Sequence, residues 1–274
     1  MMEQRPLYRK DVFGACFSDC SAANSLLERL AAGIRGVFGS DFISLVCYGS
    51  LVWGGFDEAL SDVDLAAVLR REISESDLPA LRDLHAALEE EFPDWKDRVE
   101  VQYVGRCSLS RFREGWGRMA NISPGEPLHL VPCTVDWLTN WYFAGEYGKV
   151  LIGAPREDVF PEIAHTEFLE AVRRSALEWP ERLDDIRNSC GYQGYAVLTL
   201  CRACYTLSTG RQISKQGAAA WMAEKRPETA PLVADALRWR KEQDTGTDVP
   251  AHTLKRVEEF VQMVVGWVRT GRYE

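Results

Sequence analysis

The chain has 274 residues, of which 46% are hydrophobic and 27% charged, and its formal net charge is −9. This length can hold one large domain or two modest ones. No apolar run approaches the ~20 residues that span a bilayer, and the first residues lack the apolar segment of a secretory signal. We therefore expect a cytoplasmic protein with no membrane partner. The acidic charge argues against a nucleic-acid partner, since phosphate neutralisation needs a basic surface, and it is compatible with a small cationic substrate.

The first third of the chain alternates between helical and strand-like patterns. Residues 11–40 are predicted to form a helix, because apolar residues recur close to the 3.6-residue period until Gly39. Two strand-like apolar runs follow at 43–48 and 61–69, and a loop rich in glycine separates them. A second amphipathic helix is predicted from the start signal at 76–79 to Phe92, before Pro93.

The second strand-like run carries Asp62 and Asp64 one residue apart. Side chains at i and i+2 of a strand point to the same face, so these carboxylates should lie side by side while Val63 and Leu65 enter the core. Two carboxylates so close repel each other unless a cation lies between them, and Mg²⁺ binds through one or two carboxylates together with substrate phosphates. The pair therefore predicts a magnesium site; the simpler interpretation is two solvated acids at a strand end.

Two further segments extend this pattern. Gly49-Ser50 closes the first strand, where glycine allows a tight turn and the close approach of backbone N–H groups to an anion. Residues 97–104 alternate like a strand and point Glu100 to the same side as Gln102. A Gly-Ser loop, an Asp-x-Asp strand and a later strand with one acid together predict a phosphoryl-transfer site of the two-metal type, with Glu100 as the third acid.

The remainder of the chain divides in two. Residues 105–135 are expected to be irregular, 136–144 helical, and 149–155 a short buried strand that completes the sheet. We therefore expect an α/β domain over residues 1–157, with a small mixed sheet and flanking helices, followed by an all-α helical bundle over 158–274. The helices of the bundle are predicted near 168–179, 195–209, 217–224, 230–242 and 254–268, with a C-terminal cap at Gly210 and a polar loop at 244–248.

The helix at 195–209 carries two kinds of candidate residue. Cys201 and Cys204 have Cys-x-x-Cys spacing without a second pair at zinc-finger distance, so we interpret them as small buried hydrophobes. Arg202 lies in an apolar run, and a buried guanidinium needs an anionic partner. Lys215 lies at the predicted start of the next helix, where free N–H groups favour phosphate. From these residues alone, a bundle carboxylate beside Arg202 and a solvated Lys215 are the simpler explanations.

The chain resembles a known group of enzymes in both halves. The motif Gly49-Ser50-x11-Asp62-x-Asp64, with the later Glu100, resembles the nucleotidyltransferase superfamily that includes DNA polymerase beta. The run from Leu198-Thr-Leu-Cys-Arg202 through Thr209-Gly-Arg and Lys215 to Trp221 resembles the helical domain of the streptomycin/spectinomycin-type aminoglycoside adenylyltransferases. Both parts match in order, and 105–135 is the least secure region.

This resemblance implies a monomeric enzyme that transfers AMP from ATP, with Mg²⁺, to a hydroxyl group of an aminoglycoside or aminocyclitol. It also implies roles for single residues: nucleotide contacts for Gly49, Ser50 and Ser61, Mg²⁺ binding by Asp62 and Asp64, a general base and further metal ligand in Glu100, and phosphate binding by Arg202 and Lys215.

The drug-binding half of the site carries over less well. Where the family binds streptomycin through an acid and an imidazole or amide, this chain has Tyr192 and Tyr195, and Trp116 is the candidate for the aromatic residue that stacks on the drug. Asp184, Asp185 or Glu126 could supply the missing charge. Two alternatives stay open: an adenylyltransferase that acts on a protein or another metabolite, and a non-catalytic nucleotide-binding protein, although three intact acids argue against the latter.

Overall fold

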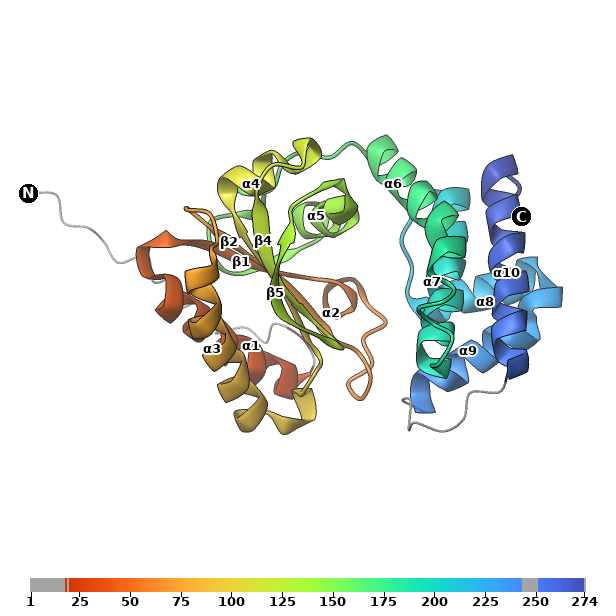
Figure 1. The fold of residues 1–274 in the computed structure, drawn as a ribbon, viewed down its shortest axis with the longest axis horizontal. Coiled ribbons are helices and arrows are strands. Elements are labelled where there is room, and N and C mark those ends of the chain that lie inside the picture. The colour runs from red at the N-terminus through yellow and green to blue at the C-terminus, as the bar shows by residue number, and fades with distance from the viewer. Residues whose placement is uncertain (1–17, 19, 243–250, 274) are drawn as a thin grey trace, which may run out of the picture. The chain divides into compact units, whose positions relative to one another are not determined.

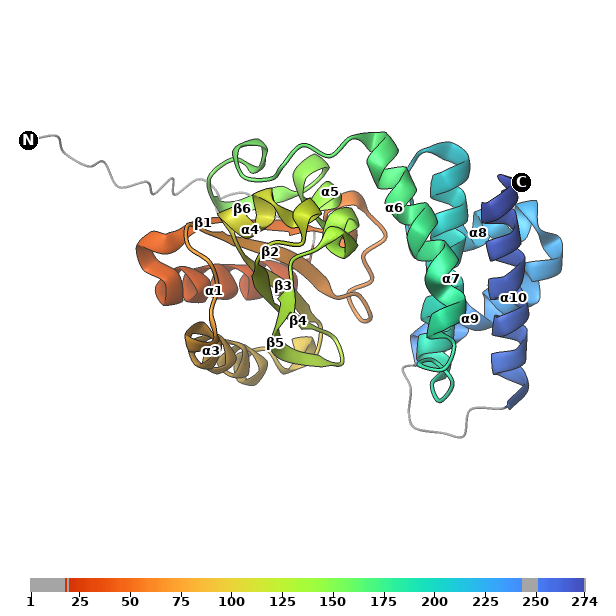
Figure 2. The same ribbon diagram turned by 45° about the horizontal axis from the view of Figure 1, so that its top comes forward.

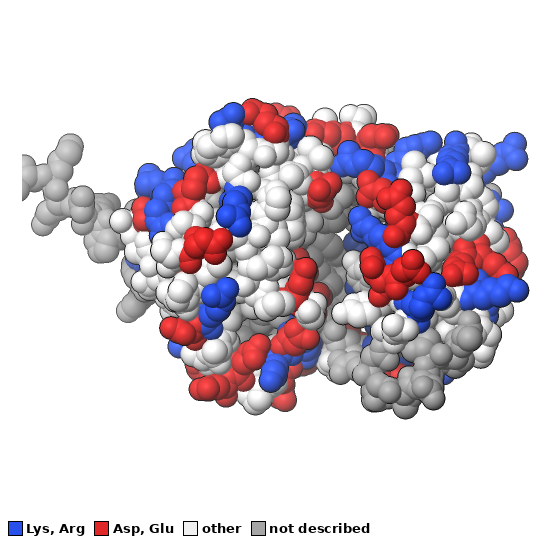
Figure 3. Space-filling view, in the orientation of Figure 1, with Lys and Arg blue, Asp and Glu red and all other residues white. Residues whose placement is uncertain are grey.

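The computed structural model describes residues 18, 20–242 and 251–273, and the chain divides into two compact units, 1–162 and 163–274 (Figure 1). The domain boundary predicted after residue 157 stays a prediction; the two units divide a few residues further along. Within the described residues, none of the helices is both long and apolar enough to cross a bilayer. On the face drawn in Figure 3, acidic and basic side chains are interspersed rather than gathered by sign.

The first unit is built on a six-stranded sheet with the strand order β5-β4-β3-β2-β1-β6. The strands are β1 (Phe42–Tyr48), β2 (Val63–Leu69), β3 (Val99–Gly105), β4 (Arg118–Ser123), β5 (Glu126–Pro132) and β6 (Lys149–Gly153). The pair β2 and β3 is parallel and the other neighbours are antiparallel, which confirms the predicted mixed sheet.

The two faces of this sheet differ in chemistry. Helices α1 (Ser21–Phe38) and α3 (Leu78–Glu91) cover one face (Figure 2), and they pack against alternate strand residues such as Val63, Leu65 and Tyr103. The strand residues between them, such as Asp64, face the opposite side. The shorter helices of the unit are α2 (Ser50–Trp53), α4 (Arg106–Ser110) and α5 (Leu138–Glu146), of which α2 and α5 contact β1.

The predicted first helix is wrong at its beginning. Cys20 has an extended backbone and its Sγ accepts a hydrogen bond from the Ala23 amide, so it caps a helix that begins at Ser21. Residues 11–17 lie outside the described part of the chain. The end of the helix at Gly39 is confirmed, since Gly39 has a positive φ and its amide donates to the carbonyl of Arg35.

The expectation of irregular structure at 105–135 is also wrong, because β4 and β5 form a hairpin there. The prolines that argue against a strand, Pro127 and Pro132, both lie in β5, which is an edge strand with one row of backbone N–H groups outside the ladder. The strand predicted at 149–155 exists as β6 but is half-exposed rather than buried, since it forms the other edge of the sheet.

The second unit consists of helices that pack around one hydrophobic core, as predicted. They are α6 (His165–Glu178), α7 (Cys190–Thr209), α8 (Lys215–Lys225), α9 (Ala230–Glu242) and α10 (Ala251–Thr270). The predicted loop at 244–248 lies outside the described residues. Cys201 and Cys204 are buried in this core, and none of the cysteines that the structure describes is in a disulfide.

Helix α7 begins at Cys190, five residues before the predicted start. The Ser189 side chain caps it by accepting a hydrogen bond from the amide of Tyr192. Gly194 lowers the intrinsic helix propensity here, but it is needed because a Cβ at this position would lie 3.0 Å from the carbonyl oxygen of Ala236 on α9. Close helix–helix packing therefore outweighs the local preference. The predicted C-terminal cap is confirmed at Gly210, whose φ is 70°.

Candidate active site

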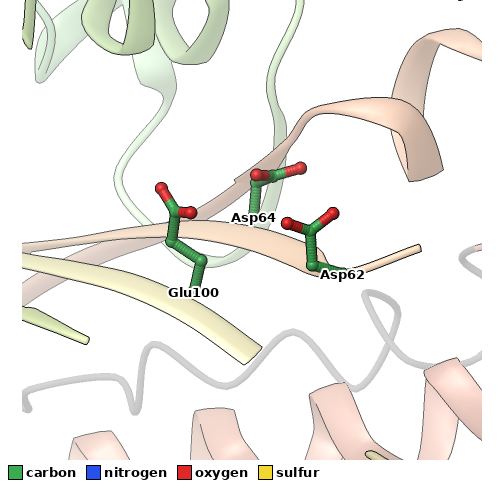
Figure 4. Close-up of side chains that lie close together, drawn as sticks. All are labelled: Asp62, Asp64 and Glu100. Atoms are coloured by element: carbon green, nitrogen blue, oxygen red, sulfur yellow. The ribbon is translucent and has the colours of Figure 1, made fainter. Parts of the chain in front are cut away.

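Three carboxylates converge where β2 and β3 begin. Asp64 and Glu100 are register partners on the parallel strands β2 and β3, and Asp62 directly precedes β2. One oxygen of each carboxylate lies within 4.8 Å of those of the other two, and all three residues are half-buried. Figure 4 shows that the three carboxylates point toward the same side of the two strands. Asp62 and Asp64 therefore lie side by side as predicted, although β2 begins only at Val63.

Gly49 holds the turn beside Asp64. Its φ of 75° is a conformation that favours glycine, and a Cβ at this position would lie 1.7 Å from Oδ2 of Asp64. The backbone of the turn thus lies directly against the carboxylate, and Ser50 follows as the first residue of α2. The glycine of the Gly-Ser motif is therefore required both by this close contact and by the turn.

The loop before Asp62 is fixed by hydrogen bonds around Ser61. Ser61 Oγ accepts from the amide of Asp57 (3.0 Å), and the carbonyl of Ser61 accepts from Nε and Nη2 of Arg98 (3.1 and 2.6 Å). The guanidinium of Arg98 also lies 4.6 Å from the ring centroid of Trp95. Ser61 is only 1% exposed, so these contacts indicate a part in positioning Asp62, and its predicted contact with a nucleotide stays a prediction.

Behind Glu100 lies a network of hydrogen bonds. Gln102 Nε2 donates to Glu100 Oε1 (2.7 Å) and to Asn121 Oδ1 (3.2 Å), while the Tyr48 hydroxyl donates to Gln102 Oε1 (2.6 Å) and accepts from Asn140 Nδ2 (3.1 Å). Burial and the nearby Glu100 carboxylate raise the pKa of Tyr48 well above its usual value, so the hydroxyl stays protonated. Sequence reasoning placed Gln102 beside Glu100 but missed Tyr48 and Asn140.

The acidic group fits a hard divalent cation. Carboxylate oxygens in a cluster are the ligands that Mg²⁺ prefers, and the half-buried setting leaves the cluster accessible to a nucleotide. Asp62 and Asp64 flank one strand residue, and Glu100 reaches the same cluster from the neighbouring strand. These residues would hold the ion.

The two predicted phosphate-binding residues belong to the second unit. Arg202 is half-buried on α7, and Lys215 is the first residue of α8, whose N-cap Ser214 accepts a hydrogen bond from the amide of Gly217. The Lys215 ammonium lies 5.2 Å from the ring centroid of Tyr195. The structure thus brings the three acids and Gly49 together, whereas the phosphate-binding roles of Arg202 and Lys215 stay predictions.

The fold of this chain, a mixed sheet with a Gly-Ser turn and three clustered carboxylates followed by a helical unit, is shared by a solved adenyltransferase. A crystal structure of spectinomycin adenyltransferase AAD(9) from Enterococcus faecialis, with ATP and spectinomycin, superposes with a TM-score of 0.70 over 89% of this chain and 98% of the other, at 18% identity.

Sequence comparisons point to the same kind of enzyme. Residues 158–266 match the family "Aminoglycoside adenylyltransferase, C-terminal domain". The chain is 27% identical to an aminoglycoside (3'')(9) adenylyltransferase of Klebsiella pneumoniae over 235 residues, and the aligned region covers 80% of this chain and 84% of the relative. A protein of the same name from Rhizobium radiobacter is 29% identical over 127 residues, and this alignment covers 45% of this chain and 44% of the relative. These matches bear out the resemblance: the chain is similar to aminoglycoside adenylyltransferases over most of its length, and residues 158–266 match the C-terminal domain of that family.

Proposed function

We propose that this protein uses Mg²⁺ and ATP to adenylylate a hydroxyl group of an aminocyclitol or aminoglycoside, with Glu100 as general base. The observation that carries the proposal is the cluster of Asp62, Asp64 and Glu100 within 4.8 Å beside the Gly49 turn, in a chain that matches this family over residues 158–266. A protein that only bound nucleotides would not need a third carboxylate on the neighbouring strand, in register with Asp64.

The residues suggest how the reaction proceeds. Phosphoryl-type transfer needs charge neutralisation and positioning rather than a covalent intermediate. Bound to Asp62 and Asp64, Mg²⁺ would neutralise phosphate charge and orient the nucleotide. Glu100 would accept the proton of the acceptor hydroxyl while that oxygen forms a bond to the α-phosphorus. The bond from the α-phosphorus to the bridging oxygen then breaks, and pyrophosphate leaves with that oxygen.

The acceptor is the part of the reaction that similarity to this family leaves open. Tyr192 and Tyr195 are 54% and 50% exposed and lie three residues apart on α7. Neither ring offers a negative charge, and the Tyr195 ring already contacts the Lys215 ammonium. Asp184, one candidate for the missing charge, already pairs with Arg187 (2.6 Å). At positions 192 and 195 the guanidinium groups of streptomycin would lack a carboxylate partner, which only Asp185 or Glu126 could then supply, whereas spectinomycin has no guanidinium. We infer a preference for spectinomycin or another aminocyclitol.

Turnover of MgATP by the purified protein tests the proposal. Pyrophosphate release is measured with spectinomycin, with streptomycin and with no acceptor, and the products are identified by mass spectrometry. We expect drug-dependent pyrophosphate release, an AMP–drug product and a larger kcat/KM for spectinomycin. Equal or better use of streptomycin would refute the acceptor argument alone. Modification of a protein or metabolite in place of every drug would overturn the proposed acceptor class.

A further inference from the structure

Gln102 is a buried polar side chain that the reaction as described does not use. It is 0% exposed in the middle of β3, where the amide can be tolerated only because both of its ends are hydrogen-bonded. A hydrophobic residue would fill this position without that requirement. The identity of its partners therefore indicates what the glutamine is for.

The direction of the hydrogen bonds is set from Tyr48. A protonated Tyr48 hydroxyl donates to the amide oxygen of Gln102, at 2.6 Å, which turns the amide nitrogen toward Glu100, at 2.7 Å. A second acceptor, Asn121 Oδ1, lies 3.2 Å from the same nitrogen. A reversed amide would place its oxygen against two acceptors, Glu100 Oε1 and Asn121 Oδ1, and only the Tyr48 hydroxyl, which can also accept, would tolerate the exchange. The network allows one orientation of Gln102.

From this geometry we propose that Gln102, oriented by Tyr48, is a positioning residue that holds one oxygen of the Glu100 carboxylate in place for catalysis. The inference rests on the proposed function, in which Glu100 accepts the proton. A glutamate side chain has three rotatable bonds, so an unanchored carboxylate samples several rotamers. A charge-assisted hydrogen bond from a rigid, buried donor removes most of that freedom.

The same strand provides a matched control. Tyr103, the residue after Gln102, is fully buried on the opposite face of the sheet, and its hydroxyl lies 2.8 Å from Nε2 of His85. Tyr48→Phe and Tyr103→Phe each remove one buried tyrosine hydroxyl. The first loses the hydrogen bonds with Gln102 and Asn140, which belong to the network that reaches Glu100, and the second loses the hydrogen bond with His85, which does not.

The variants are compared by kcat, KM for ATP, ATP affinity by calorimetry and thermal unfolding. We expect Gln102→Leu to lower kcat by ~10–10²-fold and Tyr48→Phe by a smaller factor, with KM and ATP affinity within about twofold of the wild type, because a misplaced group costs rate rather than binding. Tyr103→Phe should lower the Tm about as much as Tyr48→Phe without changing kcat. Equal losses of kcat in the two tyrosine variants would overturn the inference.

A double-mutant cycle separates positioning from general disruption. In the Glu100→Gln background, Tyr48→Phe should cause no further loss of kcat, because the group that the network positions no longer acts as a base. A loss as large as in the wild-type background would refute the inference. If Glu100→Gln itself retains full activity, or if the wild type modifies no acceptor, the proposed function fails. Crystal structures then decide the inference: Glu100 displaced in Tyr48→Phe supports it, and an unchanged Glu100 overturns it.

Discussion

Replacing Gly49 by alanine should separate the strain in a turn from damage to the site. Gly39 and Gly49 flank β1, both have positive φ values (52° and 75°), and an alanine at either position carries a backbone penalty of ~1–3 kcal/mol. For a unit of this size that penalty corresponds to a decrease in Tm of roughly 2–12 °C. A Cβ at Gly39 meets nothing within 4 Å, whereas at Gly49 it would lie 1.7 Å from Oδ2 of Asp64.

The added methyl group at Gly49 must therefore displace the Asp64 carboxylate from 1.7 Å to at least 3.0 Å, the shortest contact that a Cβ tolerates. Misplacement of about 1 Å at a reacting centre costs ~10² in rate. We expect both alanine variants to lose Tm, but only Gly49→Ala to lose adenylylation, by at least ~10²-fold per folded molecule. Pyrophosphate release at saturating MgATP, with the folded fraction measured by circular dichroism, provides the comparison. Turnover of Gly49→Ala within threefold of Gly39→Ala would refute this reasoning.

Further substitutions test single groups of the site and of the core. Asp64→Asn should abolish turnover and Mg²⁺-dependent ATP binding, measured by calorimetry, with little change in Tm, and near-wild-type adenylylation would exclude Asp64 as a metal ligand. Glu100→Gln should keep ATP affinity and lower kcat by ~10²–10⁴, the usual contribution of a positioned base, whereas an equal loss of ATP affinity would make Glu100 mainly a metal ligand. Burial lowers the pKa of His85 from 6.5 to about 4. Between these pH values the unfolded chain binds a proton that the folded chain does not. The free energy of unfolding should therefore fall as the pH drops from about 6.5 toward 4, by up to roughly 3 kcal/mol, at about 1.36 kcal/mol per unit of pKa shift. Denaturant unfolding of His85→Gln should lose this part of the pH dependence, and an unchanged slope would show that His85 is already charged in the folded protein.

The candidate site was predictable as far as local periodicity reaches. The two-residue period of a strand placed Asp62 and Asp64 together and Val63 in the core, and the structure confirms both. The same period placed Glu100 and Gln102 on one side of their strand. The sheet topology makes β3 run parallel to β2 and places Glu100 opposite Asp64. No local sequence pattern specifies that arrangement.

Apart from the start of the first helix, where Cys20 caps the helix locally, the errors have a common physical origin in tertiary context. The prolines of β5 are acceptable because this strand lies at the edge of the sheet, and Gly194 is acceptable in α7 because α9 packs closely against it. Tyr48 and Asn140 come from β1 and α5, so their convergence on Gln102 becomes visible only once the sheet has formed. Each miss concerns a residue whose role depends on a partner far away in the sequence.

Strand β3 shows how one segment serves stability and chemistry at once. Val101 and Tyr103 point toward α1 and α3 and are fully buried in the apolar core, whereas Glu100 and Gln102 point toward the carboxylate cluster. Loss of apolar volume on the first face removes packing and lowers the free energy of unfolding. Loss of the Gln102 amide on the second face leaves that packing intact but removes the hydrogen bond that orients the Glu100 carboxylate. Because both faces belong to one rigid strand in register with β2, the position of Glu100 is fixed by the hydrophobic core as much as by its hydrogen bonds.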